Sequence, residues 1–463
     1  MTIWQRNIFQ IVGINGAVMI RFLLLVLSST ALFSFSGKTA VFNPETHTLS
    51  NGMQVVVVTN RSAPAVVQMV WYKVGAADEP PGQSGIAHFL EHLMFKGTKY
   101  TPPGEFSKIV SRNGGTDNAF TSQDFTAYYQ KVARSKLELV MKLEAERMTK
   151  LFLSEKDVLS ERNVVLEERA SRTDNSPSAQ LFEAQQTALY LNHPYRNPVI
   201  GWEHEIRELS AENALSFYKK FYAPNNAILI VSGDVSLEEI KPLAEKYYGP
   251  IPGGAEIVRS RTFEPKHRAA RRVSVSSVHV RQPSLSRLYV TSCYRTAQRQ
   301  EAYALQVLAE IIGGGTRSRL YRSLVLDQKK AISVSVWYNP TALDYGEFGI
   351  SVTPRDNLSL EQIEEALDRQ LLKIKTEGIS HDEIRRAAKK LTAEAVYARD
   401  SLMAAPNIIG RALTTGQSLE DIEEWPERIM SVRIPDVVAA ANETLVLRNS
   451  VTSLLTPKKR EAQ

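Results

Sequence analysis

Two histidines four residues apart enclose a glutamate in the pentapeptide His88-Phe-Leu-Glu91-His92. On a helix, positions i, i+3 and i+4 share one face, so the three side chains would point the same way. Two imidazoles on adjacent turns can bind one zinc ion, and a carboxylate beside them can take a proton from a metal-activated water. The order His-x-x-Glu-His is the inverse of the common zincin motif. The spacing therefore predicts a catalytic zinc site in which Glu91 is the general base and not a ligand.

The same pentapeptide could occur by chance on a solvated helix face. Its surroundings favour the metal site, because apolar side chains flank the polar trio throughout residues 84–98. Burying two imidazoles and a carboxylate without partners would cost free energy. A bound metal would remove that cost.

A catalytic zinc usually has three protein ligands, so the motif predicts a third one elsewhere. The best candidates lie in a segment that opens with Ser154 and Asp157, a variant capping box that begins a helix. Glu161 and Glu168 are two helical turns apart on one face, whereas Glu167 would point elsewhere. Glu168 could bind the metal while Glu161 lies behind it as a hydrogen-bond partner. Spacing alone does not choose among these acids, since an acidic, Arg-rich helix is also typical of a solvated face.

Length and composition predict a large globular protein. The chain has 463 residues, of which 43% are hydrophobic and 23% charged, and this length predicts about two to four domains. The net charge of +6 is mild and the basic residues are dispersed, which argues against a nucleic-acid interface. The single cysteine, Cys293, leaves no internal disulfide to form and has no evident catalytic histidine nearby in the sequence. We predict that it is structural and lies in a strand.

The first 36 residues differ from the rest of the chain. Arg21 precedes an apolar run of roughly signal-peptide length that ends in the small residues Ser34 and Ser36. This predicts an export signal and a mature protein in the periplasm of a two-membrane bacterium, with no stable membrane anchor after cleavage. Met19 directly precedes the run, so translation could begin there. A retained anchor beginning near Ile8 is the alternative, although polar residues interrupt that run.

The second half of the chain repeats the pattern of the first half. Strand-like runs at 66–74 and 286–294 each precede an apolar helix, and charged helices follow at 155–173 and 381–398. A Pro- and Gly-rich stretch at 249–255 suits a linker between two such units. We therefore divide the chain into a signal peptide, a zinc-bearing domain, a linker and a C-terminal domain, at 1–36, 37–250, 251–270 and 271–463.

The second copy lacks the metal triad. Aligning residues 305–316 with the zinc helix places three different residues opposite His88, Glu91 and His92. These are Gln306, Ala309 and Glu310. One zinc site per chain is expected.

With these motifs the chain resembles the pitrilysin-type zinc metallopeptidases, the inverzincin group. In that family the third ligand lies well downstream of the second histidine and is the later of two glutamates two helical turns apart, a position that corresponds to Glu168. The resemblance implies one Zn²⁺ per chain, with Glu91 as catalytic base and Glu161 behind the ligands. It implies the following metal ligands: His88, His92 and Glu168.

The resemblance extends beyond the metal site. The segment 118–129 is similar to the family's edge strand, which implies that Asn118, Ala119 and Phe120 align a bound peptide. Its β-branched and aromatic residues suit a strand, and an exposed edge can bind an extended peptide by strand addition. A plain sheet strand is the alternative interpretation. Two further family landmarks are a turn at His193 and a helix leading into a buried strand at 217–234.

The resemblance also implies an architecture. It predicts an α+β fold with two homologous units, each an antiparallel sheet flanked by helices, that form half of a clamshell chamber. A complete chamber needs four such units and this chain supplies two. The family therefore implies a homodimer, or a heterodimer with a related subunit.

One departure from the family bears on mechanism. Self-sufficient relatives carry an Arg and a Tyr, after the C-terminal counterpart of the zinc helix, that stabilise substrate and oxyanion. Here Val325 and Ile332 occupy these positions. The chain thus resembles the zinc-bearing subunit of processing-peptidase-like bacterial proteases, whose partner supplies the Arg and the Tyr. The nearby stretch 313–319 predicts a helix C-cap in preference to a substrate-facing loop.

We predict a zinc-dependent endopeptidase that cleaves extended peptides. A catalytically silent scaffold subunit of the same fold is the rival hypothesis, and the intact motif residues argue against it. Zinc storage is a third possibility, and it would not need Glu91.

Overall fold

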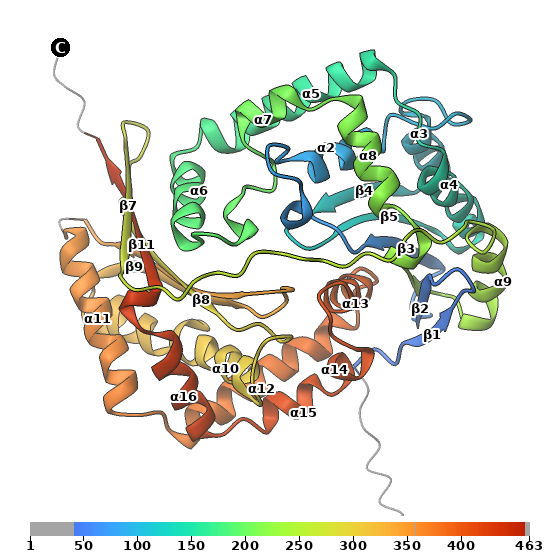
Figure 1. The fold of residues 1–463 in the computed structure, drawn as a ribbon. Helices are drawn as coiled ribbons and strands as arrows, with labels where there is room; N and C mark the ends of the chain where they lie inside the picture. Colours follow the sequence, from blue (N-terminus) through green and yellow to red (C-terminus); the bar gives the residue numbers. More distant parts are fainter. Residues whose placement is uncertain (1–40, 357, 459–463) are drawn as a thin grey trace, which may run out of the picture. The chain divides into compact units, whose positions relative to one another are not determined.

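The computed structural model describes residues 41–356 and 358–458. The predicted export signal and its alternative, a membrane anchor, lie outside the described residues. Among the described helices, none is long and apolar enough to cross a membrane. Figure 1 shows the two sheets, each accompanied by helices.

The first sheet has six strands in the order β1-β2-β6-β3-β5-β4. Its central strand β6 is buried at every residue, which its run of β-branched and aliphatic side chains permits. β4 lies at the open edge. The strands are β1 Glu45–Thr48, β2 Gln54–Thr59, β3 Ala65–Tyr72, β4 Thr116–Thr121, β5 Thr126–Ala133 and β6 Ala227–Gly233.

The second sheet has five strands in the order β7-β11-β8-β10-β9. Antiparallel pairing was expected and holds for every pair but one in each sheet, because β2 runs parallel to β6 and β7 runs parallel to β11. The predicted runs 66–74 and 286–294 correspond to β3 and β8. The strands are β7 Arg271–Ser277, β8 Ser284–Thr291, β9 Ala331–Asn339, β10 Gly346–Pro354 and β11 Ser450–Pro457.

Some of the first-half helices begin at a serine that caps their N-terminus. Ser154 accepts a hydrogen bond from the backbone N–H of Asp157, as its capping pattern predicted. The helix that follows continues into a short π-helical turn, η3 Ala170–Asp174. The helices are α2 Ile86–Leu93, α3 Glu105–Arg112, α4 Leu137–Lys150, α5 Glu155–Arg169, α6 Pro177–Leu189, α7 Glu203–Glu208, α8 Ala211–Phe221 and α9 Leu237–Tyr247.

The second half has a similar order of elements, with five strands in place of six. The helix predicted at 381–398 is present with those bounds, and Ser380 caps it in a capping box with Glu383. No helix or strand lies between Tyr247 and Arg271 in the described chain. The helices are α10 Glu301–Gly313, α11 Leu360–Thr376, α12 His381–Ala398, α13 Ala404–Thr414, α14 Leu419–Glu423, α15 Trp425–Met430 and α16 Ile434–Thr444, with the π-helical turn η6 Tyr321–Asp327.

The two halves exchange a helix. α13 from the second half packs on β3 and β6 of the first sheet (Figure 1). Gly410 in α13 lies so close to Trp71 that a Cβ atom would clash with its ring. α6 from the first half packs on β7, β11 and β8 of the second sheet, and the buried Gln185 donates a hydrogen bond to the carbonyl of Val451. Each sheet is therefore covered on one face by a helix of the other half.

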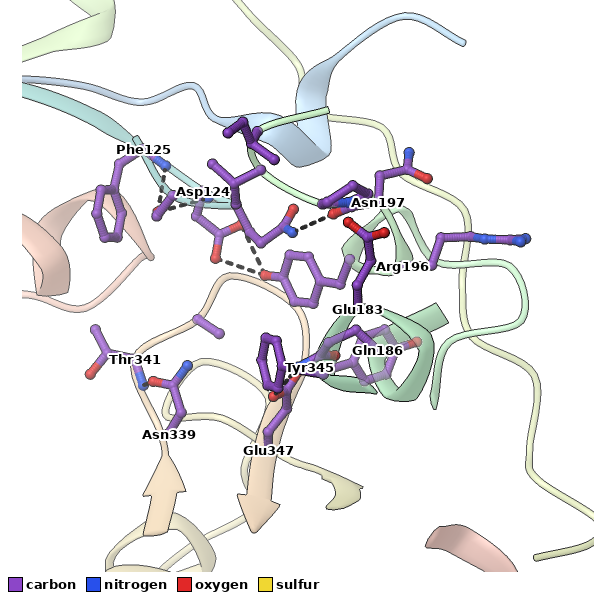
Figure 2. Close-up of a pocket in the computed structure, with 18 of the residues that line it drawn as sticks. Asp124, Phe125, Glu183, Gln186, Arg196, Asn197, Asn339, Thr341, Tyr345 and Glu347 are labelled. Carbon is purple, nitrogen blue, oxygen red and sulfur yellow. Dashed lines mark hydrogen bonds between the residues drawn. The ribbon is translucent and has the colours of Figure 1, made fainter. Parts of the chain in front are cut away.

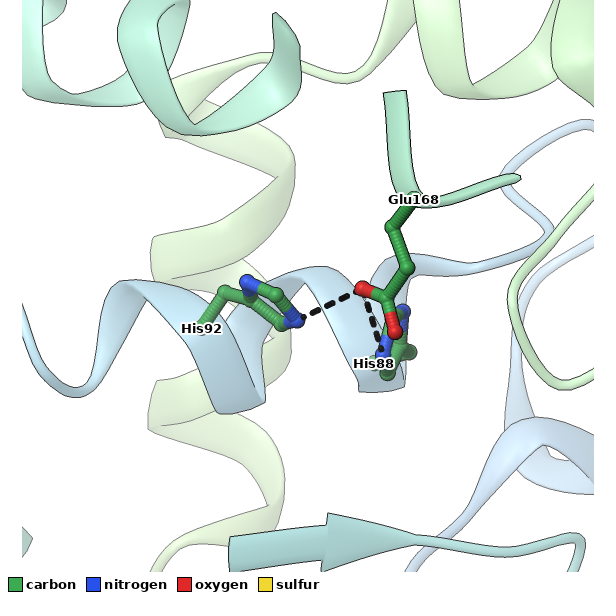
Figure 3. Close-up of side chains that lie close together, drawn as sticks. All are labelled: His88, His92 and Glu168. Carbon is green, nitrogen blue, oxygen red and sulfur yellow. Dashed lines mark ion pairs between the residues drawn. The ribbon is translucent and has the colours of Figure 1, made fainter. Parts of the chain in front are cut away.

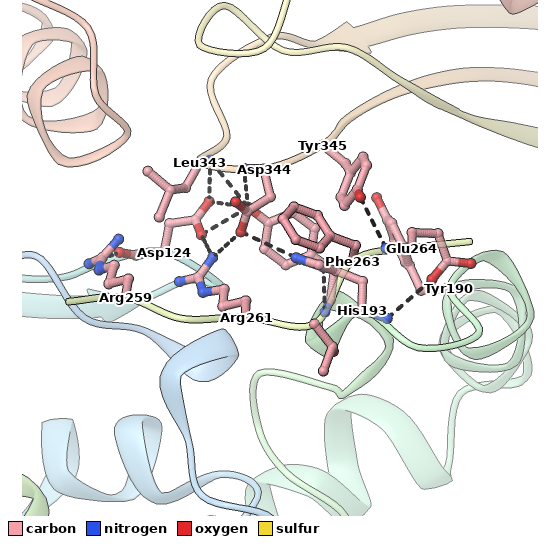
Figure 4. A network of polar contacts seen from close by, with 12 residues as sticks. Asp124, Tyr190, His193, Arg259, Arg261, Phe263, Glu264, Leu343, Asp344 and Tyr345 are labelled. Carbon is pink, nitrogen blue, oxygen red and sulfur yellow. Dashed lines mark hydrogen bonds and ion pairs between the residues drawn. The ribbon is translucent and has the colours of Figure 1, made fainter. Parts of the chain in front are cut away.

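A buried polar network joins the same two halves (Figure 4). At its centre is Arg261, which lies in the stretch between the sheets and has a side chain only 5% exposed. Its guanidinium pairs with Asp78 at 2.8 Å, Asp124 at 2.6 Å and Asp344 at 2.9 Å. The turn at His193 contributes as well, because its Nε2 lies 3.2 Å from Asp344. Charges that are this deeply buried are stable only with such partners.

Candidate metal centre

The helix that carries the histidines is fixed at its N-terminus. Gly85 precedes α2 with φ of +87°, and a Cβ atom there would lie 2.5 Å from the carbonyl oxygen of Ile200. The carboxylate of Glu79 accepts hydrogen bonds from the N–H groups of Gly85 and Ala87, both at 2.9 Å, where the helix dipole favours negative charge. α2 then buries its apolar face in the core of the first half.

The opposite face of α2 presents His88 and His92 to α5, which supplies Glu168 (Figure 3). The Oε2 atom of Glu168 lies 3.7 Å from Nε2 of His88 and 3.2 Å from Nε2 of His92. These side chains could hold a metal ion, since their ligand atoms all lie within 4.8 Å of one another. The structure thus brings together the three ligands predicted from the sequence, whereas Glu167 is exposed.

The second nitrogen of each histidine has a different environment. Nδ1 of His92 lies 2.8 Å from Oε1 of Glu161, and the other oxygen of Glu161 forms an ion pair with Lys96. This arrangement fixes the His92 ring with Nε2 toward Glu168. Nδ1 of His88 is buried and has no hydrogen-bond partner among the described residues.

Burial and charge set the protonation of the site. Burial lowers the pKa of His88 to about 3, so this imidazole is neutral at ordinary pH and keeps a lone pair for a metal. Burial alone would lower the pKa of His92 too, but Glu161 and the neighbouring carboxylates outweigh it and the net direction is upward. Burial would raise the pKa of Glu161, yet His92 and Lys96 lower it overall.

These residues fit a zinc ion. Two imidazole nitrogens and one carboxylate oxygen form a donor set found in catalytic zinc sites. With bonds of about 2.0–2.1 Å, tetrahedral ligand atoms lie roughly 3.3 Å apart, close to the spacings of Glu168 Oε2 to the two Nε2 atoms. His88 is neutral, so its Nε2, the nitrogen that faces Glu168, carries no positive charge that would repel a metal ion.

Glu91 lies on the same helix but does not join the three ligands. Its side chain is buried, and Thr121 Oγ1 donates a hydrogen bond to its Oε2 at 2.6 Å. Burial raises the pKa of Glu91, while the Thr121 hydrogen bond acts in the opposite direction. Thr121 is the last residue of β4, so the edge strand and the carboxylate are directly connected.

The predicted peptide-aligning residues all lie in β4. The segment 118–129 is a hairpin and not one strand, since a turn at 122–125 leads into β5. Asn118 is exposed, and its Oδ1 accepts the N–H of Ala119 at 2.8 Å, so this N–H is not used in pairing with β5. Phe120 packs edge-on against Trp71 on the sheet face away from Glu91. The side chain of Phe120 is therefore part of the core, and only its backbone lies at the edge.

Comparison with known proteins identifies the family. Residues 54–203 match the model described as "Insulinase (Peptidase family M16)", and residues 208–391 match "Peptidase M16 inactive domain". The zinc protease PqqE of Helicobacter pylori is 32% identical over 94% of this chain and 98% of its own. The chain belongs to the M16 peptidase family.

Solved structures share the M16 fold. A crystal structure of a protease from Helicobacter pylori aligns with a TM-score of 0.83 and 31% identity, covering 89% of this chain and 99% of that one. The periplasmic protease PqqL of Escherichia coli aligns with a TM-score of 0.77, covering 89% of this chain but 47% of its own. At 19% identity this second likeness shows the fold alone. The M16 fold of this chain thus corresponds to about half of the PqqL chain.

A cavity of about 430 Å³ lies at the end of β4 in this M16 chain (Figure 2). It is lined by the β4–β5 turn, by α6, by residues 195–200 and by the β9–β10 connection of the second half.

In the half that matches the M16 inactive domain, the residues opposite His88, Glu91 and His92 do not form a set of metal ligands. Glu310 forms an ion pair with Lys390 of α12, with Nζ 2.8 Å from Oε1. Gln306 donates a hydrogen bond to the hydroxyl of Tyr294, and Ala309 is buried.

Among the neighbouring positions, the prediction for the end of α10 is confirmed, whereas the predicted strand position of Cys293 is wrong. Gly314 caps α10 at its C-terminus, as predicted. Val325 is buried in η6, and Ile332 is half exposed in β9, so neither supplies a charge or a hydroxyl. Cys293 lies just beyond β8 and not in the strand, and it is buried with Sγ 3.2 Å from Thr296 Oγ1.

Several polar residues around the M16 site were not singled out from the sequence. Lys96 and Arg172 each lie four residues after a predicted ligand, so helical spacing could have indicated them. Thr121 directly follows the predicted peptide-aligning residues. Arg261 had no comparable signal, because its partners come from distant segments on both sides.

Proposed function

We propose that this chain is a zinc-dependent endopeptidase. The observation that carries the proposal is the convergence of His88, His92 and Glu168 beside a buried, hydrogen-bonded Glu91. Family membership supports it, since similar M16 proteins are named zinc proteases. The three ligands would hold zinc, which supplies the Lewis-acid chemistry that makes water nucleophilic at neutral pH.

The remaining steps belong to residues of the chain. Glu91 takes the proton from the attacking water and later delivers it to the leaving amine. Thr121 holds Oε2 of Glu91, which leaves Oε1 for proton transfer. Glu161 keeps the His92 ring in place through Nδ1.

The substrate is an extended peptide that adds to β4 as a further strand. The edge position of β4 supports this proposal, and Asn118 would exchange its bond to the Ala119 N–H for one with the peptide. The backbone of Ala119 and Phe120 would pair with the substrate. Because Thr121 continues the same strand, a peptide on β4 lies next to the catalytic base.

The chain acts in the periplasm with a second subunit. Val325 and Ile332 have no side-chain hydrogen-bond donor that could stabilise an oxyanion. One donor of this kind often lowers the activation free energy by about 2.7–4 kcal/mol. A related partner chain that supplies an Arg and a Tyr would restore that contribution, whereas a homodimer would not. The basic and apolar N-terminal segment supports export.

A silent scaffold subunit is the alternative. It would have no use for a buried Glu91 that is hydrogen-bonded next to three convergent ligands.

The substitution Glu91→Gln tests the proposal, with Glu167→Gln as control because Glu167 is exposed on α5. We expect Glu91→Gln to bind zinc like the wild type and to lose cleavage of a quenched fluorescent peptide library, while Glu167→Gln keeps both. Each protein is assayed from residue 37 onward, alone and with candidate partner subunits. Unchanged cleavage by Glu91→Gln would refute the mechanism, and a wild type that binds no zinc would refute the function.

A further inference from the structure

Two cations contact the carboxylates of the metal centre from outside. Lys96 pairs with Glu161 and Arg172 pairs with Glu168. In both cases the cation takes one oxygen of the carboxylate while the other oxygen faces a histidine of the site. Neither cation contributes a ligand atom to the centre.

Lys96 acts through a chain of two contacts. Its ammonium pairs with Oε2 of Glu161, whose Oε1 lies 2.8 Å from Nδ1 of His92. The Lys96 side chain is 26% exposed and that of Glu161 is 9% exposed, so solvent screens this pair only in part. With Oε2 occupied, Glu161 has one oxygen to offer, and that oxygen orients His92.

Arg172 acts on a ligand directly. It lies one helical turn after Glu168, and its NH1 atom is 2.5 Å from Oε1 of that residue. This leaves Oε2, the atom nearest both Nε2 nitrogens, as the metal-facing oxygen. The Arg172 side chain is 75% exposed, so solvent weakens its contribution.

The two cations also balance charge. Glu91, Glu161 and Glu168 are three carboxylates within one small site, and repulsion among them would disfavour the arrangement without a metal. Lys96 and Arg172 offset two of these charges in the metal-free protein. The side chains of the site can therefore keep their arrangement in the metal-free protein.

We propose that Lys96 and Arg172 are positioning residues that orient His92 and Glu168 for zinc and thereby strengthen zinc binding. The proposal rests on the zinc site proposed above. It does not depend on peptide cleavage, because its readout is the affinity of the metal-free protein for zinc.

The experiment measures zinc affinity by competition with a chromophoric chelator, beginning with metal-free protein. We expect Lys96→Met to weaken binding about 10- to 100-fold, the range for loss of a partner behind a ligand. Lys96→Arg keeps the positive charge and should recover most of the affinity. Lys99→Met is the matched control, because Lys99 is exposed and forms no ion pair among the described residues. A Lys96→Met protein that binds zinc within two-fold of Lys99→Met would overturn the role of Lys96.

A second pair of variants tests Arg172. We expect Arg172→Met to weaken zinc binding about two- to five-fold, since exposed ion pairs contribute little, and Arg172→Lys to recover part of the loss. The control is Arg207→Met, which removes the pair of Arg207 with Glu203 at the same helical spacing away from the site. Equal affinities for Arg172→Met and Arg207→Met would remove Arg172 from the proposal.

Two further measurements distinguish a loss of zinc affinity from a failure to fold and from a general structural effect. Circular dichroism of each metal-free variant identifies any that fails to fold, and Lys96→Gln then replaces Lys96→Met. The visible spectrum of cobalt-loaded protein should change for Lys96→Met and not for Lys99→Met, because it reports ligand geometry. If the wild type binds zinc but cleaves nothing, the endopeptidase proposal fails while this inference is still tested in full.

Discussion

Each half of the chain brings an equivalent pair of helices together, α2 with α5 and α10 with α12. The two helix junctions are stabilised differently. In the first half, α2 and α5 bring together His88, His92 and Glu168, which could hold a metal ion. In the second half, α10 and α12 meet at Lys390, whose ammonium lies 2.8 and 3.0 Å from the two carboxylate oxygens of Glu310 and 2.8 Å from the carbonyl of Gly314. The covalently attached cation in the second half makes a metal unnecessary. The fold accommodates either solution, so the chemistry lies in a few side chains and not in the architecture.

The largest expected effect is a difference in zinc binding between a variant of the first helix junction and a variant of the second. His92→Ala removes a ligand and should abolish zinc binding, whereas Glu310→Ala at the counterpart position should leave it unchanged. Elemental analysis of the purified variants measures this directly. Zinc retained by His92→Ala, or lost from Glu310→Ala, would break the comparison.

The second prediction concerns the buried polar network around Arg261 that joins the two halves. Arg261→Leu leaves Asp78, Asp124 and Asp344 without their shared cation, and breaking such a buried pair costs about 3–5 kcal/mol. We expect the free energy of unfolding in denaturant to fall by that amount. Arg295→Leu is the control, because Arg295 also pairs with Asp344 but is 44% exposed. Equal losses for both variants would show that the halves do not depend on the buried network.

Acid should weaken the same buried network. Burial would raise the pKa of Asp344, but His193 and Arg261 reverse this and hold it at about 2. A lowered carboxyl pKa stabilises the fold above the ordinary value of 3.8, and the contribution, about 2 kcal/mol, is lost as pH falls toward 2. Unfolding measured between pH 6 and 2 should therefore be less pH-dependent in Asp344→Asn.

The control for this prediction is Asp327→Asn, since Asp327 is exposed and has no ion pair among the described residues. It should follow the pH dependence of the wild type. If Asp344→Asn also followed the wild type, the acid sensitivity would arise elsewhere in the molecule.

The smallest expected effect is a change in stability on replacing Lys390, which lies at the junction of α10 and α12. Lys390→Met leaves Glu310 without its partner, but Lys390 is 47% exposed, so we expect a loss below about 1 kcal/mol in unfolding free energy. Zinc affinity should not change. The neighbouring Lys389→Met, which removes an exposed lysine with no ion pair among the described residues, serves as control. A change in zinc affinity would mean that the halves are coupled more closely than their contacts indicate.

Local signals in the sequence predicted much of the fold. The zinc helix, the capped helix from Glu155 and the helix at 381–398 follow from spacing and caps, which act within a few residues. The convergence of Glu168 with His88 and His92 required the family resemblance, because spacing left several acids open. Antiparallel pairing was wrong for β2–β6 and β7–β11, since the relative direction of two distant strands depends on the chain that connects them and is not encoded in either strand alone.

The contacts between the halves could not be predicted in this way. The exchange of α6 and α13 depends on shape at long range, for example the close approach of Gly410 to Trp71. The partners of Arg261 come from three separate segments. No local pattern specifies such a meeting.

The exchanged helices have a consequence for limited proteolysis. Residues 252–256 are exposed and lie in a stretch without helix or strand, so a protease could cut there. The fragments would not separate, because α6 remains on the second sheet and α13 on the first. A nicked preparation should therefore run as two bands under denaturing conditions yet elute as one species from a sizing column.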